Sequence, residues 1–323
     1  MAGGPVVIST PMLDLVEQYL ADRRSLGFAL RVDSQQLRSF ARFADGSGHR
    51  GPVTIDLVVR WATLPTSRVR RFPGRRLEVI RPFARYRASI DAAGEVPSRF
   101  LLGPPRHRPI HHIYSDDQVV ALVAEAAKLP PPGRLRPRTY ATLFALLAAT
   151  GLRVSEALRL RRDEVDLTRD VLVVRATKFR KSRLVPLHVT ATEALRGYVA
   201  DRDRLVSHAS APTFFVAHAD GALHYSTVRT VFLRLRHTLG WDGLAPRPRI
   251  HDLRHTFACR RLRDWYAQGL DVNALIASLA TYLGHAHVTD TYWYLTGSPE
   301  LLALAAGRFE KHADFDRPME GES

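Results

Sequence analysis

The sequence predicts a mainly α-helical protein with a small β-sheet, organised in two domains. Most apolar residues recur at helical spacing, whereas two short runs, 171–174 and 184–187, have the composition of β-strands. A break rich in Gly, Pro and basic residues covers residues 94–112, and no helix can continue through its prolines. We therefore expect a helical domain over residues 1–93, a linker over 94–112 and a longer mixed domain over 113–323.

Four helices are predicted in the first domain from apolar residues that recur at helical spacing. They lie at about 10–27, at 33–44, onward from Thr54, and at 75–90. The last of these contains Pro82, which removes a backbone hydrogen bond and should kink or split the helix. The first domain is therefore an all-helical module.

The second domain combines further helices with one predicted β-hairpin. The two strand-like runs flank the basic segment 178–182 (KFRKS), so the hairpin has a charged tip. Helices are predicted at about 115–128, 138–149, from 153 onward, 190–204, 226–239, 251–267, 272–283 and 299–308.

The composition excludes several classes of protein. Hydrophobic residues make up 46% of the 323 residues, which is enough to build packed cores and excludes a disordered chain. No segment approaches the ~20 apolar residues that a membrane span needs. A single cysteine allows no internal disulfide, so we expect a cytoplasmic protein.

The charge of the chain predicts a polyanionic partner. There are 47 basic and 32 acidic side chains, a formal net charge of +15, and residues 1–112 carry 18 of the basic and 9 of the acidic ones. Only four of the basic residues are lysines, and the planar guanidinium of arginine suits bidentate contacts to phosphate. Arginine-rich, solvated helix faces are the alternative, but nucleic acid is favoured over an acidic membrane surface.

Three motifs carry polar residues at informative spacings. In TGLRVSEAL, Arg153 and Glu156 share a helix face, a spacing that also describes an ordinary exposed ion pair. In HDLRHTFA, His251 and Arg254 share a face, although two donor groups have reason to adjoin only if an anion lies between them. In LGHAHV, His285 follows a glycine that ends a helix.

Together these motifs resemble the tyrosine recombinase (phage integrase) family. The three motifs, the basic hairpin between the first two, and a tyrosine nine positions after His285 occur in the order of that family. The resemblance covers about residues 113–310 by motif, and the preceding module resembles the core-binding (SAM-like) domain of the family by pattern alone. The ending TYWYLTGSPELL is similar to that of transposon-borne members.

The resemblance implies a role for each of these residues in metal-independent transesterification of DNA. Tyr294 would attack a phosphorus atom and form a 3′-phosphotyrosine, and a 5′-hydroxyl of a partner strand would then complete strand exchange. Arg153 and Arg254 would clamp the phosphate, while His251 would bond the phosphate and accept the tyrosine proton. The remaining roles are a second phosphate donor, a general acid for the leaving 5′-oxygen and a supporting carboxylate, implied for His285, Lys178 and Glu156.

Two of these assignments have a rival nearby. Lys181 lies in the same basic turn as Lys178 and is an alternative general acid. Tyr292 lies two residues before Tyr294, and the spacing from His285 favours Tyr294. In the same region Cys259 is interpreted as an inert packing residue.

The expected partner is double-stranded DNA with a specific core site, gripped by both domains, and no cofactor or metal is expected. An apolar helix at 299–308 is implied to pack on a neighbouring protomer in a homo- or hetero-tetramer on synapsed DNA, with packing on its own domain as the alternative. The competing functions are a type IB topoisomerase-like enzyme, a non-catalytic DNA-binding accessory protein and a hydrolytic nuclease.

Overall fold

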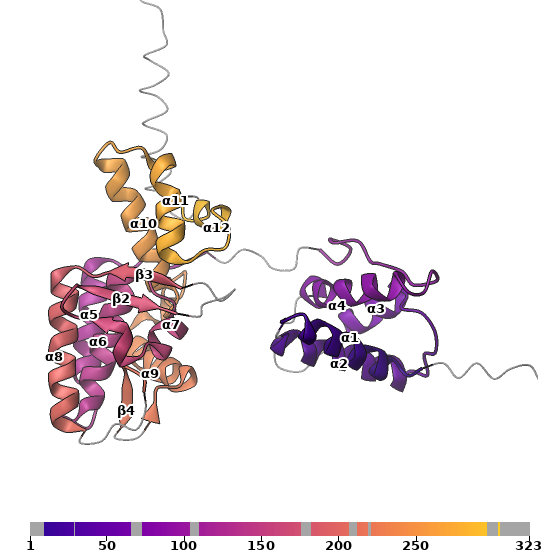
Figure 1. The fold of residues 1–323 in the computed structure, drawn as a ribbon, viewed down its shortest axis with the longest axis horizontal. Helices are drawn as coiled ribbons and strands as arrows, with labels where there is room; N and C mark the ends of the chain where they lie inside the picture. Colours follow the sequence, from indigo (N-terminus) through magenta and orange to yellow (C-terminus); the bar gives the residue numbers. More distant parts are fainter. Residues whose placement is uncertain are drawn as a thin grey trace, which may run out of the picture. The chain divides into compact units, whose positions relative to one another are not determined.

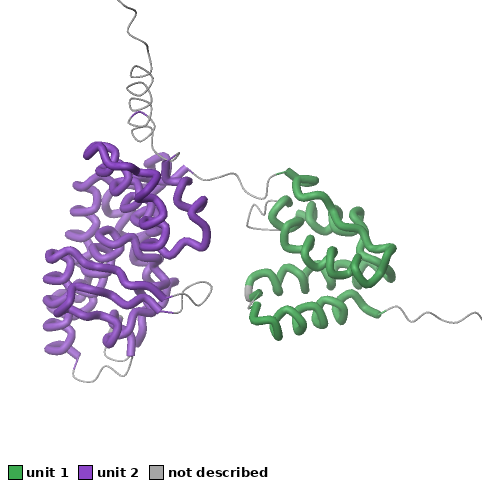
Figure 2. Tube along the Cα trace, turned by 45° about the horizontal axis from the view of Figure 1, so that its top comes forward, with its two compact units in different colours: residues 1–109 green, residues 110–323 purple. Residues whose placement is uncertain are grey.

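The chain folds into two compact units, Met1–Pro109 and Ile110–Ser323 (Figure 2). The structure is a computed structural model. It describes residues 10–28, 30–65, 73–103, 110–175, 182–206, 212–218, 221–295 and 303. The predicted tip of the basic hairpin, with Lys178 and Lys181, and most of the predicted helix 299–308 lie outside these residues.

The first unit consists of helices α1 (Met12–Ser25), α2 (Arg31–Gly46), α3 (Ile55–Thr63) and α4 (Pro73–Ala88) (Figure 1). Their apolar faces meet in one core, in which Phe40 packs edge-on against Trp61 and Phe83. Helix α4 is a single element that continues through Pro82, so Pro82 does not split it. The four helices agree with the predicted positions to within a few residues.

Described residues at both ends of the predicted linker 94–112 make hydrogen bonds within the adjoining unit. On the first unit, the backbone N–H of Glu95 donates to Val53 O at 2.8 Å, and its carboxylate accepts from Ile55 N at 2.6 Å. On the second unit, His111 Nδ1 lies 3.1 Å from Asp252 Oδ1, and His112 Nε2 lies 2.9 Å from Gln118 Oε1. Composition alone did not reveal these contacts, because backbone groups in Pro-rich segments can still find partners on a neighbouring surface.

The second unit begins with helices α5 (Asp116–Ala127), α6 (Leu135–Thr150) and α7 (Val154–Arg159). An antiparallel sheet follows, with strands β1 (Val165–Asp166), β2 (Val171–Val174) and β3 (Arg183–Pro186) in that order. Strand β2 pairs with β3 in the register Leu172 opposite Val185, which is the predicted hairpin. A second pair, β4 (Val216–His218) and β5 (Gly221–Ala222), was not predicted because it is very short.

The other helices of this unit are α8 (Val189–Leu205), α9 (Tyr225–Thr238), α10 (Asp252–Ala267), α11 (Val272–Leu283) and α12 (Thr289–Tyr292). Helix α6 is buried along most of its length and packs on α5, α8 and α10. Helices α10, α11 and α12 gather at one end of the unit, next to β3 (Figure 1). The mainly helical fold with a small sheet is confirmed.

Within the described part of the chain, no helix is both long enough and apolar enough to cross a membrane.

Candidate active site

Four segments that are distant in the sequence converge at the end of the second unit. They are the α6–α7 junction, the start of β3, the start of α10, and the stretch from the end of α11 to Tyr294. Helix α6 ends at Gly151, whose φ of 62° favours glycine. A Cβ atom there would lie 2.6 Å from the Phe257 ring, so this glycine also lets α10 pack closely against the turn.

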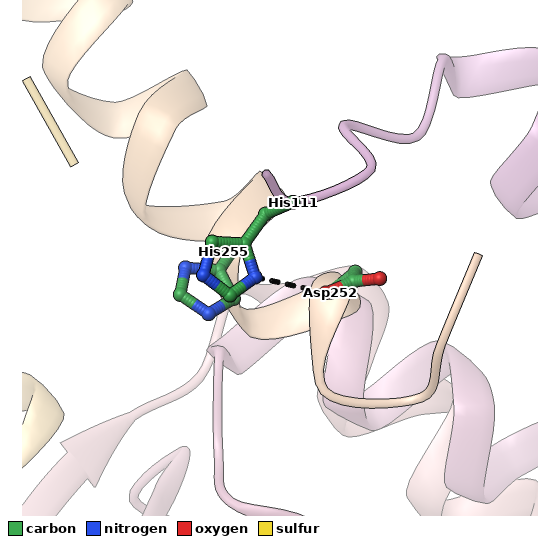
Figure 3. Close-up of side chains that lie close together, drawn as sticks. All are labelled: His111, Asp252 and His255. Carbon is green, nitrogen blue, oxygen red and sulfur yellow. Dashed lines mark hydrogen bonds and ion pairs between the residues drawn. The ribbon is translucent and has the colours of Figure 1, made fainter. Parts of the chain in front are cut away.

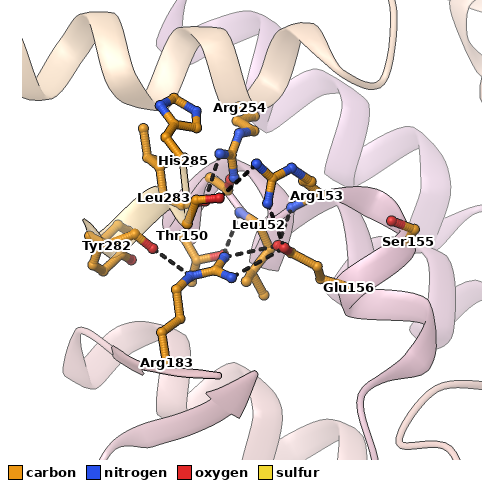
Figure 4. A network of polar contacts seen from close by, with 12 residues as sticks. Thr150, Leu152, Arg153, Ser155, Glu156, Arg183, Arg254, Tyr282, Leu283 and His285 are labelled. Carbon is orange, nitrogen blue, oxygen red and sulfur yellow. Dashed lines mark hydrogen bonds and ion pairs between the residues drawn. The ribbon is translucent and has the colours of Figure 1, made fainter. Parts of the chain in front are cut away.

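Three arginines bind the C-terminal end of α11, where the backbone carbonyls of the last helical turn have no partners within the helix. This end also carries the negative pole of the helix dipole, which favours cations. Each guanidinium takes one of three consecutive carbonyl oxygens (Figure 4). The bonds are Arg183 Nε to Tyr282 O at 2.6 Å, Arg254 Nη2 to Leu283 O at 2.7 Å, and Arg153 Nη2 to Gly284 O at 3.0 Å.

Glu156 lies between two of these arginines and is almost fully buried. Its carboxylate accepts from Arg153 Nη1 at 2.8 Å and from Arg183 Nη1 and Nη2 at 3.2 and 2.9 Å (Figure 4). Burial alone would raise the pKa of Glu156, but hydrogen bonds and charge from Arg183 and Arg153 lower it to about 2. Glu156 is therefore ionised at neutral pH and orients both guanidinium groups.

Sequence analysis did not identify Arg183. Its side chain is only 9% exposed, and the three hydrogen bonds described above use its Nε, Nη1 and Nη2 atoms. The sequence contained one signal that Arg183 is buried. Residues two apart on a strand share a face, and Val185, two residues after Arg183, is fully buried. The exposed Leu184 between them obscures that alternation.

Arg254 is the most unusual charge in the site. It is 2% exposed, and its Nη1 and Nη2 donate to Gly151 O at 2.8 Å and Leu283 O at 2.7 Å. Burial lowers its pKa to about 10. Over the described ranges, no carboxylate lies within ion-pair distance of this guanidinium. Because carbonyl groups carry no net charge, a buried cation held in this way is suited to receive an anion.

The two predicted histidines lie beside these arginines. His285 follows the left-handed Gly284, and its Nδ1 lies 2.7 Å from Thr291 Oγ1, which is fully buried. His251 precedes α10 at its N-cap and has the more accessible side chain. The desolvating surroundings and the positive charge of Arg254 lower the pKa of each imidazole to about 4, so both are neutral at pH 7.

Tyr294 lies between two imidazole rings. Its ring centroid is 5.2 Å from that of His255, edge to face, and 5.8 Å from that of His285, nearly parallel. Its hydroxyl lies 3.4 Å from His285 Nε2. Burial raises the pKa of Tyr294, and Arg254 opposes this, so the free phenol is protonated at neutral pH. Cys259 is buried here and its thiol contacts the Tyr294 carbonyl at 3.7 Å.

The rival tyrosine lies elsewhere. Tyr292 ends the short helix α12 and is 42% exposed, whereas Tyr294 is 4% exposed and contacts His285. The structure thus brings together Arg153, Glu156, His251, Arg254, His285 and Tyr294 from the predicted site, while Lys178 and Lys181 lie outside the residues it describes.

One group of side chains in the described residues has the composition of a metal site: His111, Asp252 and His255, whose ligand-type atoms lie within 4.8 Å of one another (Figure 3). Its geometry does not suit a metal ion. The two imidazole rings are stacked with centroids 3.4 Å apart, so their in-plane lone pairs run roughly parallel and do not converge. Arg249 also donates to both carboxylate oxygens of Asp252, at 2.9 and 3.1 Å.

The low pKa of Glu156 predicts how its contribution to stability depends on pH. Its folded pKa of about 2 lies below the ordinary 4.5, so the contribution is complete above pH 4.5 and is lost as the pH falls toward 2. The shift corresponds to about 3 kcal/mol. In denaturant titrations, we expect the difference in unfolding free energy between the wild type and Glu156→Gln to shrink by about that amount from pH 7 to pH 2. A difference that stays constant with pH would contradict this.

The chain is similar to known proteins over most of its length. Residues 113–300 match the model of the phage integrase family. The chain is 39% identical over 306 residues to y4rB of Sinorhizobium fredii, a protein described by its name as an integrase/recombinase, with 92% of this chain and 96% of that one covered. It is 31% identical over 249 residues to tyrosine recombinase XerD of Brucella abortus, with 75% of each chain covered.

Two solved structures share the fold. The Tn1549 transposon integrase in complex with transposon right end DNA aligns with a TM-score of 0.71 at 14% identity, covering 94% of this chain and 100% of that one. The XerH site-specific recombinase bound to a palindromic difH substrate aligns with a TM-score of 0.65 at 16% identity, covering 91% and 84%.

Proposed function

The chain belongs to the phage integrase family and is an enzyme of site-specific DNA recombination, and we propose that Tyr294 is the nucleophile of its reaction. The phenolic oxygen attacks a phosphorus atom of the DNA backbone. A bond forms between Tyr294 Oη and phosphorus, and the bond from phosphorus to the 5′-oxygen breaks. The products are a 3′-phosphotyrosine and a free 5′-hydroxyl. Because one phosphate diester replaces another, the reaction is reversible without an external energy source.

The observation that carries this proposal is the buried Arg254 guanidinium, which has carbonyl partners but, among the residues that the structure describes, no carboxylate within ion-pair distance. A DNA phosphate beside it supplies the missing negative charge, and Arg153, which bonds the adjacent carbonyl of the α11 terminus, contributes a second guanidinium. In a site shielded from water, this charge also stabilises the transition state, in which more negative charge develops on the phosphoryl oxygens. Glu156 supports the clamp by orienting Arg153 and does not transfer a proton, because its pKa is about 2.

The phenolic proton needs a neutral acceptor. The resemblance assigns this step to His251, whereas His285 Nε2 is the imidazole nitrogen 3.4 Å from the hydroxyl. Both histidines have pKa values of about 4 without an anion, and a bound phosphate raises them toward the range of a working base. The two imidazoles thus form a pair in which one bonds the phosphate while the other accepts the proton. The general acid for the leaving 5′-oxygen is assigned to Lys178, with Lys181 as its rival.

We expect a covalent protein–DNA adduct to form in the presence of EDTA, because the arginines, and no metal ion, neutralise the phosphate in this proposal. The test uses a nicked suicide substrate that carries the native DNA site, which mapping of element junctions would supply. After cleavage a short fragment diffuses away, and the adduct accumulates on a denaturing gel. Cleavage that requires a metal would instead indicate a hydrolytic nuclease, and binding without an adduct a non-catalytic accessory protein.

A second assay separates recombination from strand relaxation. Two duplexes with distinguishable flanks are incubated with the protein, and products that combine the two flanks are scored. A supercoiled plasmid with one site is treated in parallel. Exchanged products support the recombinase, whereas relaxation without exchange indicates a type IB topoisomerase-like enzyme.

The proposed partner is double-stranded DNA with a specific core site, which both units bind in the cytoplasm. The excess of arginine in residues 1–112 supports a role for the first unit in binding phosphates. The proposed assembly on synapsed DNA is a tetramer joined by the helix predicted at 299–308. A groove of about 370 Å³ on the second unit supports this, because such a helix from a neighbouring protomer could bind in it. The apolar residues that line the groove include Phe257, Trp265, Leu279 and Tyr282.

A further inference from the structure

The chain enters the second unit along the first turns of α10. Tyr114 is held there by three hydrogen bonds, from its N to Thr256 Oγ1 at 2.9 Å, from its hydroxyl to Arg249 O at 3.1 Å, and from Arg260 Nη2 to its own carbonyl at 2.9 Å. Tyr114 is 1% exposed. The segment that precedes α5 is therefore part of the second unit, and its position relative to α10 is defined.

His111 lies at the beginning of this segment, immediately after the boundary between the units. Its Nδ1 lies 3.1 Å from Asp252 Oδ1 and 3.0 Å from Arg249 Nη2 (Figure 3). If Nδ1 carries a proton it donates to the carboxylate, and if it does not it accepts from the guanidinium. The ring is thus anchored in either tautomer. Asp252 itself is fully buried, which makes it a rigid anchor.

The ring of His111 stacks on the ring of His255, which in turn contacts the ring of Tyr294. It lies parallel to the ring of His255, with centroids 3.4 Å apart and an interplanar angle of 23°. His255 in turn contacts the Tyr294 ring at 5.2 Å, and His111 meets the Trp293 ring edge to face at 6.4 Å. Trp293 therefore contacts the His111 ring, and the ring of Tyr294 contacts the His255 ring.

We propose that His111 is a positioning residue for the reaction, which seats Tyr294 by holding His255 against the phenol ring. The proposal rests on the function proposed above, in which Tyr294 attacks the phosphate. His285 supports one face of the phenol ring, and the stack of His111 and His255 supports it from another side. The nucleophile is thus supported by an imidazole from the α11 end and by a pair anchored through the segment that joins the two units.

The expected effect follows from the sensitivity of a displacement reaction to geometry. Removing the His111 ring leaves one face of the buried His255 ring without its packing partner, so His255 gains freedom to move away from Tyr294. A nucleophile displaced by a fraction of an ångström loses its alignment with the phosphorus atom and the departing oxygen. The rate of the chemical step should fall while contacts to the rest of the DNA are unchanged.

The experiment compares three variants of the full chain on the suicide substrate at saturating protein. His111→Ala removes the stack and its anchor, and His111→Phe keeps an aromatic ring without the bond to Asp252. His112→Ala is the matched control, because the neighbouring imidazole bonds Gln118 Oε1 at 2.9 Å and packs on Tyr114, with no contact to His255 or Tyr294 among its described partners. The measurements are the single-turnover rate of adduct formation, the Kd for DNA and the melting temperature.

We expect His111→Ala to form the adduct at least about tenfold more slowly with an unchanged Kd, and His111→Phe to recover most of that rate. His112→Ala should react at the wild-type rate. The proposal is overturned if His111→Ala reacts normally, if both alanine variants slow equally, or if the phenylalanine ring gives no recovery in a protein that melts at the wild-type temperature. If the wild type itself forms no adduct, the function proposed above fails, and this outcome is distinct from the others.

Discussion

Tyr294→Phe is expected to abolish the covalent protein–DNA adduct completely while leaving DNA binding at the wild-type level. The substitution removes one oxygen atom and keeps the ring that packs between His255 and His285. The lost hydroxyl lies 3.4 Å from His285 Nε2 and also interacts with Arg254, so we expect its removal to lower the free energy of unfolding by on the order of 1–2 kcal/mol. Because the phenolic oxygen is the atom that bonds to phosphorus, no residual adduct should remain.

The matched control is Tyr292→Phe, which removes the same atom from an exposed position two residues earlier. We expect this variant to form the adduct at the wild-type rate. Both proteins are incubated with the suicide substrate in EDTA, and the adduct is followed on denaturing gels, with binding measured separately by gel shift. An adduct formed by Tyr294→Phe but absent in Tyr292→Phe would transfer the role of nucleophile to Tyr292.

Loss of either clamping arginine is expected to lower the cleavage rate by about 10²- to 10³-fold or more, with DNA binding retained. Arg153 and Arg254 bond adjacent carbonyls at the end of α11, and each contributes positive charge that stabilises the transition state more than the ground state. Many other arginines remain to contact the DNA backbone, so affinity should change little. The measurement is the single-turnover rate of adduct formation by Arg153→Ala and Arg254→Ala at saturating protein.

Two controls keep this prediction specific. Arg159→Ala removes an exposed arginine from α7, the helix that follows Arg153, and should leave the rate unchanged. A substrate whose target phosphate is replaced by a neutral methylphosphonate tests the cause, because a phosphorus centre without charge needs less help from a guanidinium. The arginine variants should lose much less rate on it. An Arg254→Ala protein that is folded and cleaves the ordinary phosphate at a near-normal rate would remove Arg254 from the clamp.

Local patterns in the sequence were sufficient to predict most of the secondary structure. The spacing of apolar residues located the longer described helices to within a few residues, and two short apolar runs located the hairpin of β2 and β3. These features depend on neighbours a few positions apart, so the information lies within each segment. Elements of two to four residues, such as β4 and α12, were not predicted because so short a segment has no period to detect.

Local spacing also predicted that Arg153 lies beside Glu156, and Arg254 one helical turn after His251. It did not reveal that Glu156 also bonds Arg183, which is 27 residues away in the sequence. Nor did it reveal that His111, near the start of the second unit, stacks on His255. The prediction of one site from three motifs came from the family resemblance. Local spacing in the sequence does not determine how far apart in space those three motifs lie in the folded protein.

The sequence by itself therefore determined the helices, the hairpin, the positive charge and the chemical types of the reactive groups, since these follow from residue identity and short-range periodicity. Tertiary structure decided which tyrosine lies among the imidazoles, which arginine is buried against carbonyl groups, and which carbonyl groups hold the guanidinium groups in place. Such contacts arise only when α6, β3, α10 and α11 pack together. The burial that this packing produces shifts the pKa values of Arg254 and Tyr294, and the arginines that it brings together lower the pKa of Glu156.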